Sequence, residues 1–430
     1  MRAALTKGLV GTVALALVAL GTASQAQAAD PGVSSNSILI GMTAPQTGPA
    51  APGYKDISAG ANAYFAHLNA NGGVNGRLVT LTVADDKYSP TLTASETDKL
   101  IGGAQPVFAI FGALGTANHL AVVDRLTAAG VPDVFPNTGS SAFDNPTKYP
   151  GTFPYFPSYV VEAKVMANYI TKDAKLSGLK RCFMYQEGEF GENAGLGFNA
   201  AGMTFDAQAS YVSGSQVNPF AAQVTKLKAG GCQLVVFFGV TSATANLLLT
   251  SAALGFKPTW MVTSVGSEPE ILKSLAAAKK VDGNALLNGV YTPSFLQPIT
   301  DVGNPYVSGL KAIVEKAGLP WNFYTYYGAN SAYVLSQALK AAGKNLTRKG
   351  LISAIQKNAS SFRSAASVPM VVTANSHQGL LGYWMGQYDS AGTLGRLTPY
   401  VMIAGNNSSS STVKQIVFKP AGPTNAKLLP

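Results

Sequence analysis

The sequence is poor in charged residues, histidine and cysteine. Of its 430 residues only 12% are Asp, Glu, Lys or Arg, and it contains three histidines and two cysteines. The histidines, His67, His119 and His377, are far apart and show no metal-ligand spacing. The motifs H-E-x-x-H, G-x-x-x-x-G-K-[ST] and G-x-S-x-G are also missing. We therefore predict no metal site, no cofactor and no catalytic residue, and hence a protein that is not an enzyme.

Basic residues are in excess but do not cluster. The formal net charge is +10, and the close basic pairs are Lys180-Arg181, Lys279-Lys280 and Arg348-Lys349. No aromatic-interleaved basic stripe accompanies them, so nucleic acid is not a predicted partner. A scattered excess of lysine is typical of a solvated surface.

The first residues have the pattern of a secretory signal peptide. Arg2 and Lys7 precede an uncharged run, Gly8 to Leu20, and small residues lead to Ala26-Gln27-Ala28. The run is shorter than the roughly 20 residues that span a bilayer, which disfavours the alternative of a membrane anchor. No cysteine lies near the cleavage site. We predict a signal peptide over residues 1–28 and an exported protein, periplasmic or extracellular, without a lipid anchor.

The stretch 38–90 predicts one β-α-β unit. Residues 38–42 form an apolar run suited to a buried strand, and residues 59–70 place Ala59, Ala63, Ala66 and Ala70 on one small-residue helix face. The Gly- and Asn-rich segment 71–76 ends the helix. Residues 78–84 alternate as a second strand before Asp85-Asp86.

The same alternation continues along the chain and predicts an α/β fold with parallel sheets. Proline-rich breaks interrupt it at 150–158 and near 291–293. Gly195-Leu196-Gly197-Phe198-Asn199-Ala200 resembles a phosphate-binding glycine motif, but it lies past a strand end and is interpreted as helix packing. The further predicted helices are 93–100, 115–129, 158–173, 192–202, 219–229, 242–254, 303–317, 325–342 and 347–357. The further predicted strands are 107–111, 131–135, 181–186, 207–212, 233–239 and 259–264, with more strands within 369–418.

The two cysteines begin two apolar runs that are predicted strands. If the strands after Cys182 and Cys232 are neighbours in a parallel sheet, the two residues lie within disulfide reach. An exported protein favours a structural disulfide over two buried thiols.

Several motifs, in order and spacing, resemble the leucine/isoleucine/valine-type solute-binding proteins of ABC importers. The resemblance covers the whole mature chain and thins after about residue 370. The motifs that carry it are Ile40-Gly41, Pro45, Thr47-Gly48-Pro49, Gly60, Asn69-Ala70, Gly72-Gly73-Val74-Asn75-Gly76-Arg77, Asp85-Asp86 and Tyr88-Ser89-Pro90.

The resemblance implies two Rossmann-like lobes with parallel-sheet cores, a three-strand hinge and a ligand cleft between the lobes. On this basis lobe one comprises residues 33–155 and 293–368, and lobe two comprises 156–292 and 369–430. The third crossing is expected within 366–376. A monomer that delivers its ligand to ABC permease subunits is implied as well.

Loops after the strands supply the predicted ligand contacts. In lobe one, Gly115 and Thr116 open a helix whose amides favour a carboxylate, although Thr116 also suits an ordinary N-cap. Thr138 and Ser140 lie in the next small-polar loop, where they either contact the ligand or cap a turn. The resemblance implies that Thr116 grips the ligand carboxylate.

In lobe two, Phe190 and Thr241 occupy places where the family often carries aromatic residues. Ser264 stands where amino-acid binders of the family tend to have an acid for the ligand ammonium. Unless Glu187 or Glu268 replaces that acid, a carboxylate without an amine fits at least as well as an amino acid. Further aromatic candidates for the cleft are Tyr54, Tyr88, Tyr155, Phe156, Tyr159 and Phe323.

The predicted function is therefore the solute-binding component of a branched-chain-amino-acid-type ABC importer, which closes on a small apolar amino acid or related carboxylate. The alternative is a ligand-sensing binding protein for a separate membrane signalling partner.

Overall fold

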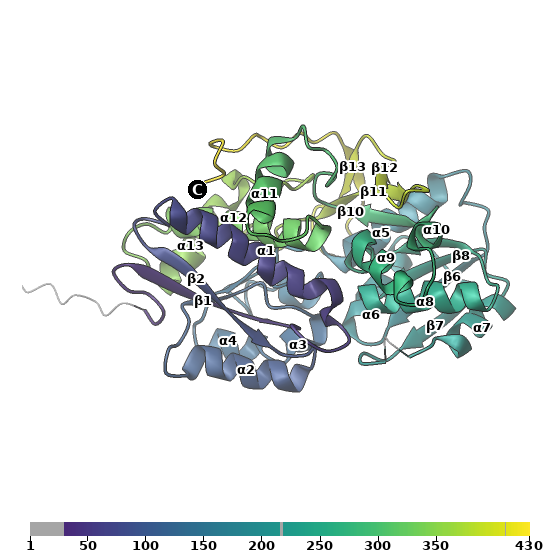
Figure 1. Cartoon of the computed structure of the whole chain (residues 1–430), viewed down its shortest axis with the longest axis horizontal. Helices are drawn as coiled ribbons and strands as arrows, with labels where there is room; N and C mark the ends of the chain where they lie inside the picture. The colour runs from purple at the N-terminus through teal and green to yellow at the C-terminus, as the bar shows by residue number, and fades with distance from the viewer. Residues whose placement is uncertain (1–29, 216–217, 409) are drawn as a thin grey trace, which may run out of the picture.

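The computed structural model describes residues 30–215, 218–408 and 410–430. The predicted signal peptide, residues 1–28, lies outside the described residues. The chain forms two α/β lobes side by side, each built on its own sheet (Figure 1). The predicted α/β class with two parallel-sheet lobes is confirmed.

The first lobe contains a five-stranded sheet in which every pairing is parallel. Helices α1 and α12 cover one face of this sheet, and α2, α3 and α4 cover the other (Figure 1). The strand order is β2 (Leu78–Asp85), β1 (Ser37–Ala44), β3 (Ala109–Phe111), β4 (Asp133–Val134) and β5 (Thr152–Phe153). The helices of this lobe are α1 (Ala51–Ala70), α2 (Pro90–Gly102), α3 (Thr116–Leu120), α4 (Val123–Ala128), α11 (Pro305–Lys316), α12 (Phe323–Ala341) and α13 (Arg348–Asn358).

The second lobe contains a nine-stranded mixed sheet. Its strands β6 to β10 pair in parallel, whereas β11 to β14 add an antiparallel extension, with β12 paired to β11 outside the main order. The order is β14 (Lys414–Ile416), β13 (Val401–Ile403), β11 (Gly382–Tyr388), β10 (Tyr291–Ser294), β9 (Thr259–Val262), β8 (Leu234–Phe238), β6 (Arg181–Gln186) and β7 (Ala207–Tyr211), and β12 is Leu394–Arg396. The helices are α5 (Tyr159–Lys172), α6 (Glu189–Ala200), α7 (Ala221–Ala229), α8 (Thr241–Ala253), α9 (Pro269–Ala277) and α10 (Gly283–Leu287).

Helix α1 buries a different face from the predicted one. Ala63 is buried, but Ala59 is only half-buried and Ala66 and Ala70 are exposed, so the prediction of a continuous alanine face is wrong. The buried face carries Gly60 and Tyr64 instead, because α1 packs on α12.

Helices α1 and α12 cross closely because each has a glycine that lies against the backbone of the other. A Cβ atom on Gly60 would lie 2.1 Å from the carbonyl oxygen of Thr325, and one on Gly328 would lie 1.9 Å from that of Ile57. Any side chain at either position would force the helices apart.

Three features differ from the sequence expectations for a physical reason. The proline-rich segments predicted as breaks each contain a short strand, β5 and β10, because tertiary pairing holds β5 beside β4 and β10 beside β9 and β11. Helices α9 and α10 lie in a stretch where no helix was predicted. The segment predicted as helix 115–129 is divided into α3 and α4.

The lobe boundaries stay a prediction, and the contacts near them are informative. The backbone N–H of Gly379 donates to the carbonyl of Pro154 at 2.7 Å, and His377 contacts the carbonyl of Thr152 through Nδ1 at 2.9 Å. Residues close to 380 therefore lie beside β5 of the first lobe.

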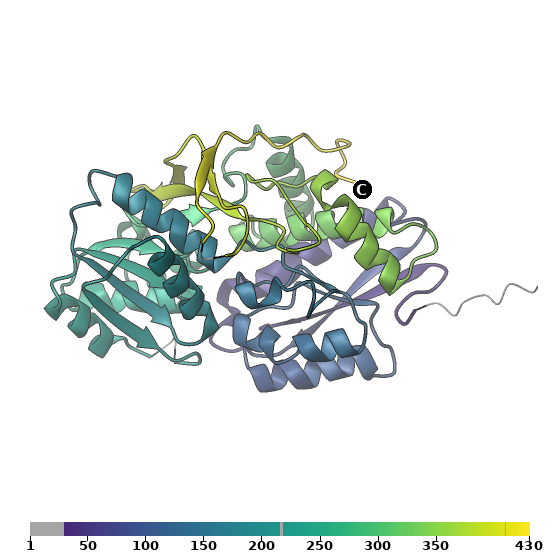
Figure 2. The same ribbon diagram turned by 180° about the vertical axis from the view of Figure 1, so that it is seen from behind.

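The last residues of the chain also return to the first lobe. The hydroxyl of Tyr64 donates to the carbonyl of Leu428 at 2.9 Å, and that of Tyr306 donates to the carbonyl of Ala421 at 2.6 Å. Both views show this C-terminal segment running from the second lobe back to the first (Figures 1 and 2).

Cys182 in β6 and Cys232, just before the neighbouring strand β8, form a disulfide, so that prediction is confirmed. Their Cα atoms are 5.7 Å apart. In the part of the chain that the structure describes, no helix is both long and apolar enough to cross a membrane.

Candidate functional site

A cleft lies between the lobes, where the carboxyl ends of the parallel strands of both sheets meet. This is the usual ligand position in open α/β sheets. We call it the interlobe cleft, and its cavity has a volume of about 40 Å³. Lobe one contributes Tyr54, Ile57, Tyr88, Leu114, Gly115, Thr116, Asn137, Phe323, Tyr324 and Tyr327, and lobe two contributes Phe156, Tyr159, Phe190, Val240, Ser264 and Val265.

Hydrogen bonds across the cleft hold the lobes closed. The carbonyl of Val265 accepts from the hydroxyls of Tyr54 at 3.1 Å and Tyr324 at 2.8 Å. Near the cleft mouth, Ser140 Oγ donates to Glu189 Oε1 at 2.9 Å, and the N–H of Ser141 donates to Asn193 Oδ1 at 2.7 Å. These four contacts join groups that are far apart in the sequence.

Glycine allows the start of α1 to reach the cleft. Gly53 has a φ of +87°, and a Cβ atom there would lie 2.6 Å from the ring of Tyr324. The resulting kink turns Tyr54 toward Tyr324, and the two ring centroids are 5.1 Å apart. A side chain at position 53 would be strained in conformation and would also meet this ring.

A second glycine shapes the wall after β3. Gly115 has a φ of +105°, and a Cβ atom there would lie 2.8 Å from both the Tyr88 ring and Asn118 Oδ1. Thr116 then begins α3, and its hydroxyl is 2.7 Å from that of Thr138. This places one hydroxyl in the cleft lining and a second directly behind it.

The tyrosines of the cleft are neutral at ordinary pH. Burial raises the pKa of Tyr88 to about 12, and burial also raises the pKa values of Tyr54, Tyr159 and Tyr324. Each phenol is therefore a hydroxyl that donates and accepts hydrogen bonds, on an otherwise apolar ring.

The described lining of the cleft contains no charged side chain. Glu162 lies behind it and accepts from the N–H of Ser264 at 2.6 Å and from Thr263 Oγ1 at 3.0 Å. Burial raises the pKa of Glu162 to about 7. The two acids that were considered as ammonium partners, Glu187 and Glu268, are absent from the lining: Glu187 accepts from Ser210 Oγ at 2.8 Å, and Glu268 accepts backbone N–H groups.

The structure brings together nine of the thirteen predicted ligand contacts in the lining. That these residues contact a ligand remains a prediction. The nine are Tyr54, Tyr88, Gly115, Thr116, Phe156, Tyr159, Phe190, Ser264 and Phe323.

The other four predicted contacts lie outside the lining. Thr138 pairs with Thr116, and Ser140 bridges the lobes. Tyr155 is fully buried, with its hydroxyl accepting from Asn330 Nδ2 at 2.9 Å, and Thr241 hydrogen-bonds Tyr324 across the lobes. These four support the walls of the cleft or their closure.

Sequence reasoning missed much of the aromatic wall contributed by α12. Tyr327 follows Phe323 by four residues, and their rings stack with centroids 6.4 Å apart. The i, i+4 spacing of two aromatic residues at a helix start is a signal that could have identified this face. Val265 gave no such signal, because its backbone carbonyl rather than its side chain carries the contact.

Comparison with known proteins identifies the class. Residues 37–393 match the family model described as periplasmic binding protein. The chain therefore belongs to the periplasmic binding protein family, and the resemblance to leucine/isoleucine/valine-type binding proteins is confirmed. Members of this family are substrate-binding proteins, which also confirms the prediction of a binding protein rather than an enzyme.

A relative and two solved structures illustrate the family. The Leu/Ile/Val-binding protein homolog 3 of Brucella melitensis is 31% identical over 215 residues, a match that takes in 49% of this chain and 56% of that protein. A branched chain amino acid ABC transporter structure from Thermus thermophilus, with bound valine, has a TM-score of 0.74 at 19% identity over 85% of this chain and 96% of that one. A fatty acid ABC transporter substrate-binding protein from Thermomonospora curvata has a TM-score of 0.73 at 21% identity over 86% and 93%.

Proposed function

We propose that this protein is the exported solute-binding component of an ABC importer, and that it closes on a small apolar carboxylate that lacks an amine. The observation that carries the proposal is the lining of the interlobe cleft, which combines aromatic rings and hydroxyls from both lobes and, among the described residues, has no charged side chain. The family and the predicted signal peptide support the transport role. Permease subunits of the importer are the proposed partner.

We place the carboxylate of the ligand at Gly115 and Thr116. The Thr116 hydroxyl lies in the lining with Thr138 Oγ1 at 2.7 Å behind it, so one of the two hydroxyls is able to donate forward. The phenol of Tyr88 lies in the same wall and stays protonated as a donor. Neutral donors stabilise an anion without requiring a buried counter-charge.

We place the apolar part of the ligand among the rings of Phe190, Tyr159 and Phe323. These rings must separate as the lobes open, because the closed cavity of about 40 Å³ is smaller than such a ligand. Phe190 and Tyr159 are packed against each other, with ring centroids 4.6 Å apart. Such walls bind an aliphatic or aromatic body through the surface that they remove from water.

An ammonium lacks a matching group in this lining. A cation that is desolvated without an anionic partner loses several kcal/mol of solvation. Of the two similar folds named above, one holds bound valine and the other is a fatty acid ABC transporter substrate-binding protein, so the architecture itself accommodates ligands with and without an amine. The absence of lining acids is the reason to favour the second kind here.

The test is calorimetric titration of the purified mature protein with matched pairs of ligands. The pairs are leucine with 4-methylpentanoate, and phenylalanine with 3-phenylpropanoate, which differ only in the amine. We expect the amine-free acids to bind and to raise the melting temperature, because a ligand that binds only the folded state stabilises it by mass action. Tighter binding of the amino acids would refute the proposed specificity, and no binding by either member of both pairs would refute a carboxylate cleft.

Thr116→Val tests the placement of the carboxylate. Removing one hydrogen bond to a charged group typically costs about 1.5 to 3 kcal/mol, so the affinity for the acid should fall by about ten- to a hundredfold. Thr147→Val, an exposed threonine in the same lobe, is the matched control and should bind as the wild type does. Equal affinity of both variants would show that the carboxylate is held elsewhere.

A further inference from the structure

A second cavity lies beside the interlobe cleft, and its volume of about 230 Å³ is larger. We call it the hinge pocket, because the segment that follows β10 on its way to the first lobe forms one of its walls. Ser264 and Phe323 line both cavities. The full lining is Ser264, Ser267, Glu268, Pro269, Glu270, Lys273, Pro293, Ser294, Gln297, Pro298, Ile299, Thr300, Trp321, Asn322, Phe323, Trp384, Tyr388, Gly392, Thr393 and Leu394.

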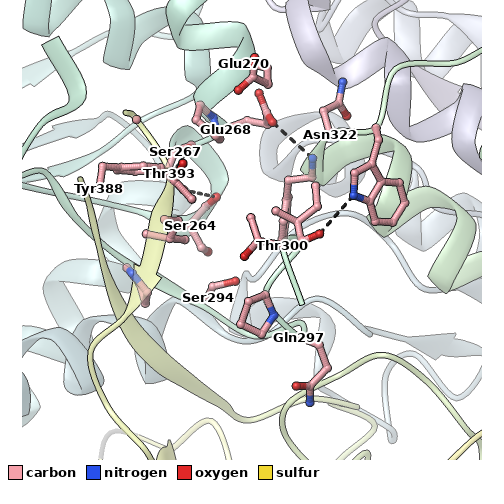
Figure 3. Close-up of a pocket in the computed structure, with 18 of the residues that line it drawn as sticks. Ser264, Ser267, Glu268, Glu270, Ser294, Gln297, Thr300, Asn322, Tyr388 and Thr393 are labelled. Atoms are coloured by element: carbon pink, nitrogen blue, oxygen red, sulfur yellow. Dashed lines mark hydrogen bonds between the residues drawn. The ribbon is translucent and has the colours of Figure 1, made fainter. Parts of the chain in front are cut away.

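A buried carboxylate faces this pocket. Glu268 is only 2% exposed. Its Oε2 accepts from the N–H of Ile271 at 2.7 Å, and its Oε1 accepts from the N–H of Phe323 in the other lobe at 3.3 Å (Figure 3). A carboxylate has about four acceptor positions, so two of them are left for a further donor.

The other charges of the pocket largely cancel. Lys273 Nζ donates to Glu270 Oε1 at 2.9 Å and to the carbonyl of Ala391 at 3.3 Å, so two of its three donors are engaged by groups other than Glu268. Within the described lining, two carboxyl groups therefore stand against one ammonium group. The charge without a side-chain ion pair is that of Glu268.

Three aromatic residues, Trp321, Trp384 and Tyr388, line the same pocket as this carboxylate. The indole N–H of Trp321 donates to the carbonyl of Ile299 at 3.2 Å, and that of Trp384 donates to Leu296 at 2.8 Å. The hydroxyl of Tyr388 donates to the carbonyl of Ser267. Because these polar atoms are already bonded to the protein, the aromatic residues offer the pocket mainly their carbon surfaces.

We propose that the hinge pocket is a second ligand site, which takes a small organic cation: a primary amine with an aromatic or aliphatic body. The ammonium would pair with Glu268, and the body would pack on the ring of Trp321 and against the edge of Trp384, whose ring already has the Arg396 guanidinium over it at 5.6 Å. Hydroxyls at the sides of the pocket, those of Ser264, Ser294 and Thr300 in Figure 3, supply further acceptors.

The size of the pocket limits the ligand. Pockets for drug-sized molecules are about 300 to 1,000 Å³, so a cavity of about 230 Å³ suits a smaller molecule. The chemistry is the opposite of that proposed for the interlobe cleft, where the lining has no charge. The hinge-pocket proposal therefore stands or falls independently of the carboxylate proposal.

The experiment titrates the mature protein with phenethylamine and with 2-phenylethanol, in which a hydroxyl replaces the amine. We expect the amine to bind and the alcohol to bind at least about tenfold more weakly, because only the amine forms an ion pair. Glu268→Gln keeps the shape and an acceptor for the N–H of Phe323, and should weaken amine binding by about ten- to a hundredfold. Glu192→Gln, an exposed acid on α6, is the matched control and should leave the affinity unchanged.

A second variant protects the test against misfolding of Glu268→Gln. Thr300 is exposed at the side of the pocket, so Thr300→Trp should fill the space without disturbing a core and should abolish amine binding. Circular dichroism and melting temperature verify that both variants are folded. The proposal is overturned if phenethylamine and 2-phenylethanol bind equally, if neither binds, or if folded Glu268→Gln and Thr300→Trp bind phenethylamine as the wild type does.

Amine binding should also strengthen between about pH 6 and pH 8. Burial, together with the nearby carboxyl groups of Glu270 and Asp56, raises the pKa of Glu268 to about 7, so the carboxylate ionises through this range. The other titratable groups around it are Lys273, Tyr324 and Tyr388. The alkyl ammonium stays protonated, so the pH profile reports Glu268. A pH-independent affinity would contradict the assigned ion pair.

Discussion

The interlobe cleft and the hinge pocket lie between the same two lobes but differ in charge and in filling. The cleft has no charged lining residue and a cavity of about 40 Å³, whereas the hinge pocket contains Glu268, Glu270 and Lys273 around about 230 Å³. They are separated by Phe323 and Ser264, which belong to both. Adjacent cavities in one molecule thus offer opposite chemistry.

The difference follows from the segments that form each wall. The cleft is formed by loops at the carboxyl ends of strands, which present tyrosine rings from both lobes that pack on one another. The hinge pocket is formed by the start of α9, the start of α12 and the segment after β10. Backbone N–H groups at the starts of the two helices donate to the Glu268 carboxylate. Aromatic rings fill the interlobe cleft, and backbone turns leave the hinge pocket open.

Helix α12 supplies walls to both cavities, so the largest expected effect comes from its packing on α1. Gly328→Ala would place Cβ 1.9 Å from the carbonyl oxygen of Ile57 and should reduce the free energy of unfolding by about 3 kcal/mol. Denaturant unfolding measures this loss. Binding of both the acid and the amine should weaken, because Phe323 moves with the helix.

A matched glycine in α6 provides the control. Gly195 has no heavy atom within 4 Å of an added Cβ, so Gly195→Ala should raise stability by about 0.5 to 1 kcal/mol. Its neighbour Gly197 is different, since a Cβ there would lie 2.3 Å from the carbonyl oxygen of Val160, consistent with the helix-packing interpretation of this motif. Equal effects of Gly328→Ala and Gly195→Ala would disprove the close helix crossing.

The second prediction compares the acids behind the two cavities, Glu162 and Glu268. Burial raises the pKa of each to about 7, above the value near 4.5 in the unfolded chain, so the folded state binds more protons between these values. The free energy of unfolding should therefore fall as pH rises, by about 2 kcal/mol per group between about pH 5.5 and 7.5, and should level off above the folded pKa.

Glu162→Gln and Glu268→Gln should each flatten this pH dependence, as measured by urea unfolding across the range. Glu192→Gln serves as the exposed control and should keep the wild-type slope. A wild-type slope in both of the buried variants would mean that these acids ionise normally in the folded protein.

The third prediction exchanges the chemistry of the cleft for that of the hinge pocket. Ser264→Asp should add a carboxylate to the cleft wall, lower the affinity for 4-methylpentanoate and raise that for leucine, with the preference changing by about tenfold or more. Ser264→Asn has a similar size without the charge and is the matched control. Calorimetric titration of both variants measures the change, and a similar preference in the two would show that charge does not decide specificity here.

The smallest expected effect concerns closure, at a serine whose Oγ also accepts from the N–H of Ala142 at 3.2 Å. Ser140→Ala removes the 2.9 Å hydrogen bond to Glu189 and should shift the lobes toward an open state by about 1 kcal/mol. The apparent affinity for the cleft ligand should then fall about fivefold, because fewer molecules are competent to hold it. Ser95→Ala, on the exposed part of α2, should have no effect on affinity. A large loss of stability in Ser140→Ala would instead indicate a structural role in the loop.

Much of the fold was predictable from local sequence. Apolar runs such as that of β8 and glycine-rich ends such as 71–76 mark elements that local physics already favours. Helix α9 was not predicted, although Glu268 caps it and Pro269 begins it. The alanine face of α1 was misjudged, because spacing identifies small residues but does not say which helix will pack against them.

The site was predictable in part for the same reason. Gly115 and Thr116 follow a strand, so their place at its carboxyl end follows from local order. The hinge pocket was not foreseen, since the N–H of Phe323 and the carboxylate of Glu268 are 55 residues apart and belong to different lobes.

The sequence by itself determined the β-α alternation, the glycine turns and the cysteine pair, because propensity, backbone freedom and strand spacing act over a few residues. Tertiary structure alone decided which groups meet: Tyr54 and Tyr324 at the carbonyl of Val265, and Glu268 at the start of α12. Contacts between distant segments depend on how two lobes pack and close. No periodicity within either segment encodes that packing.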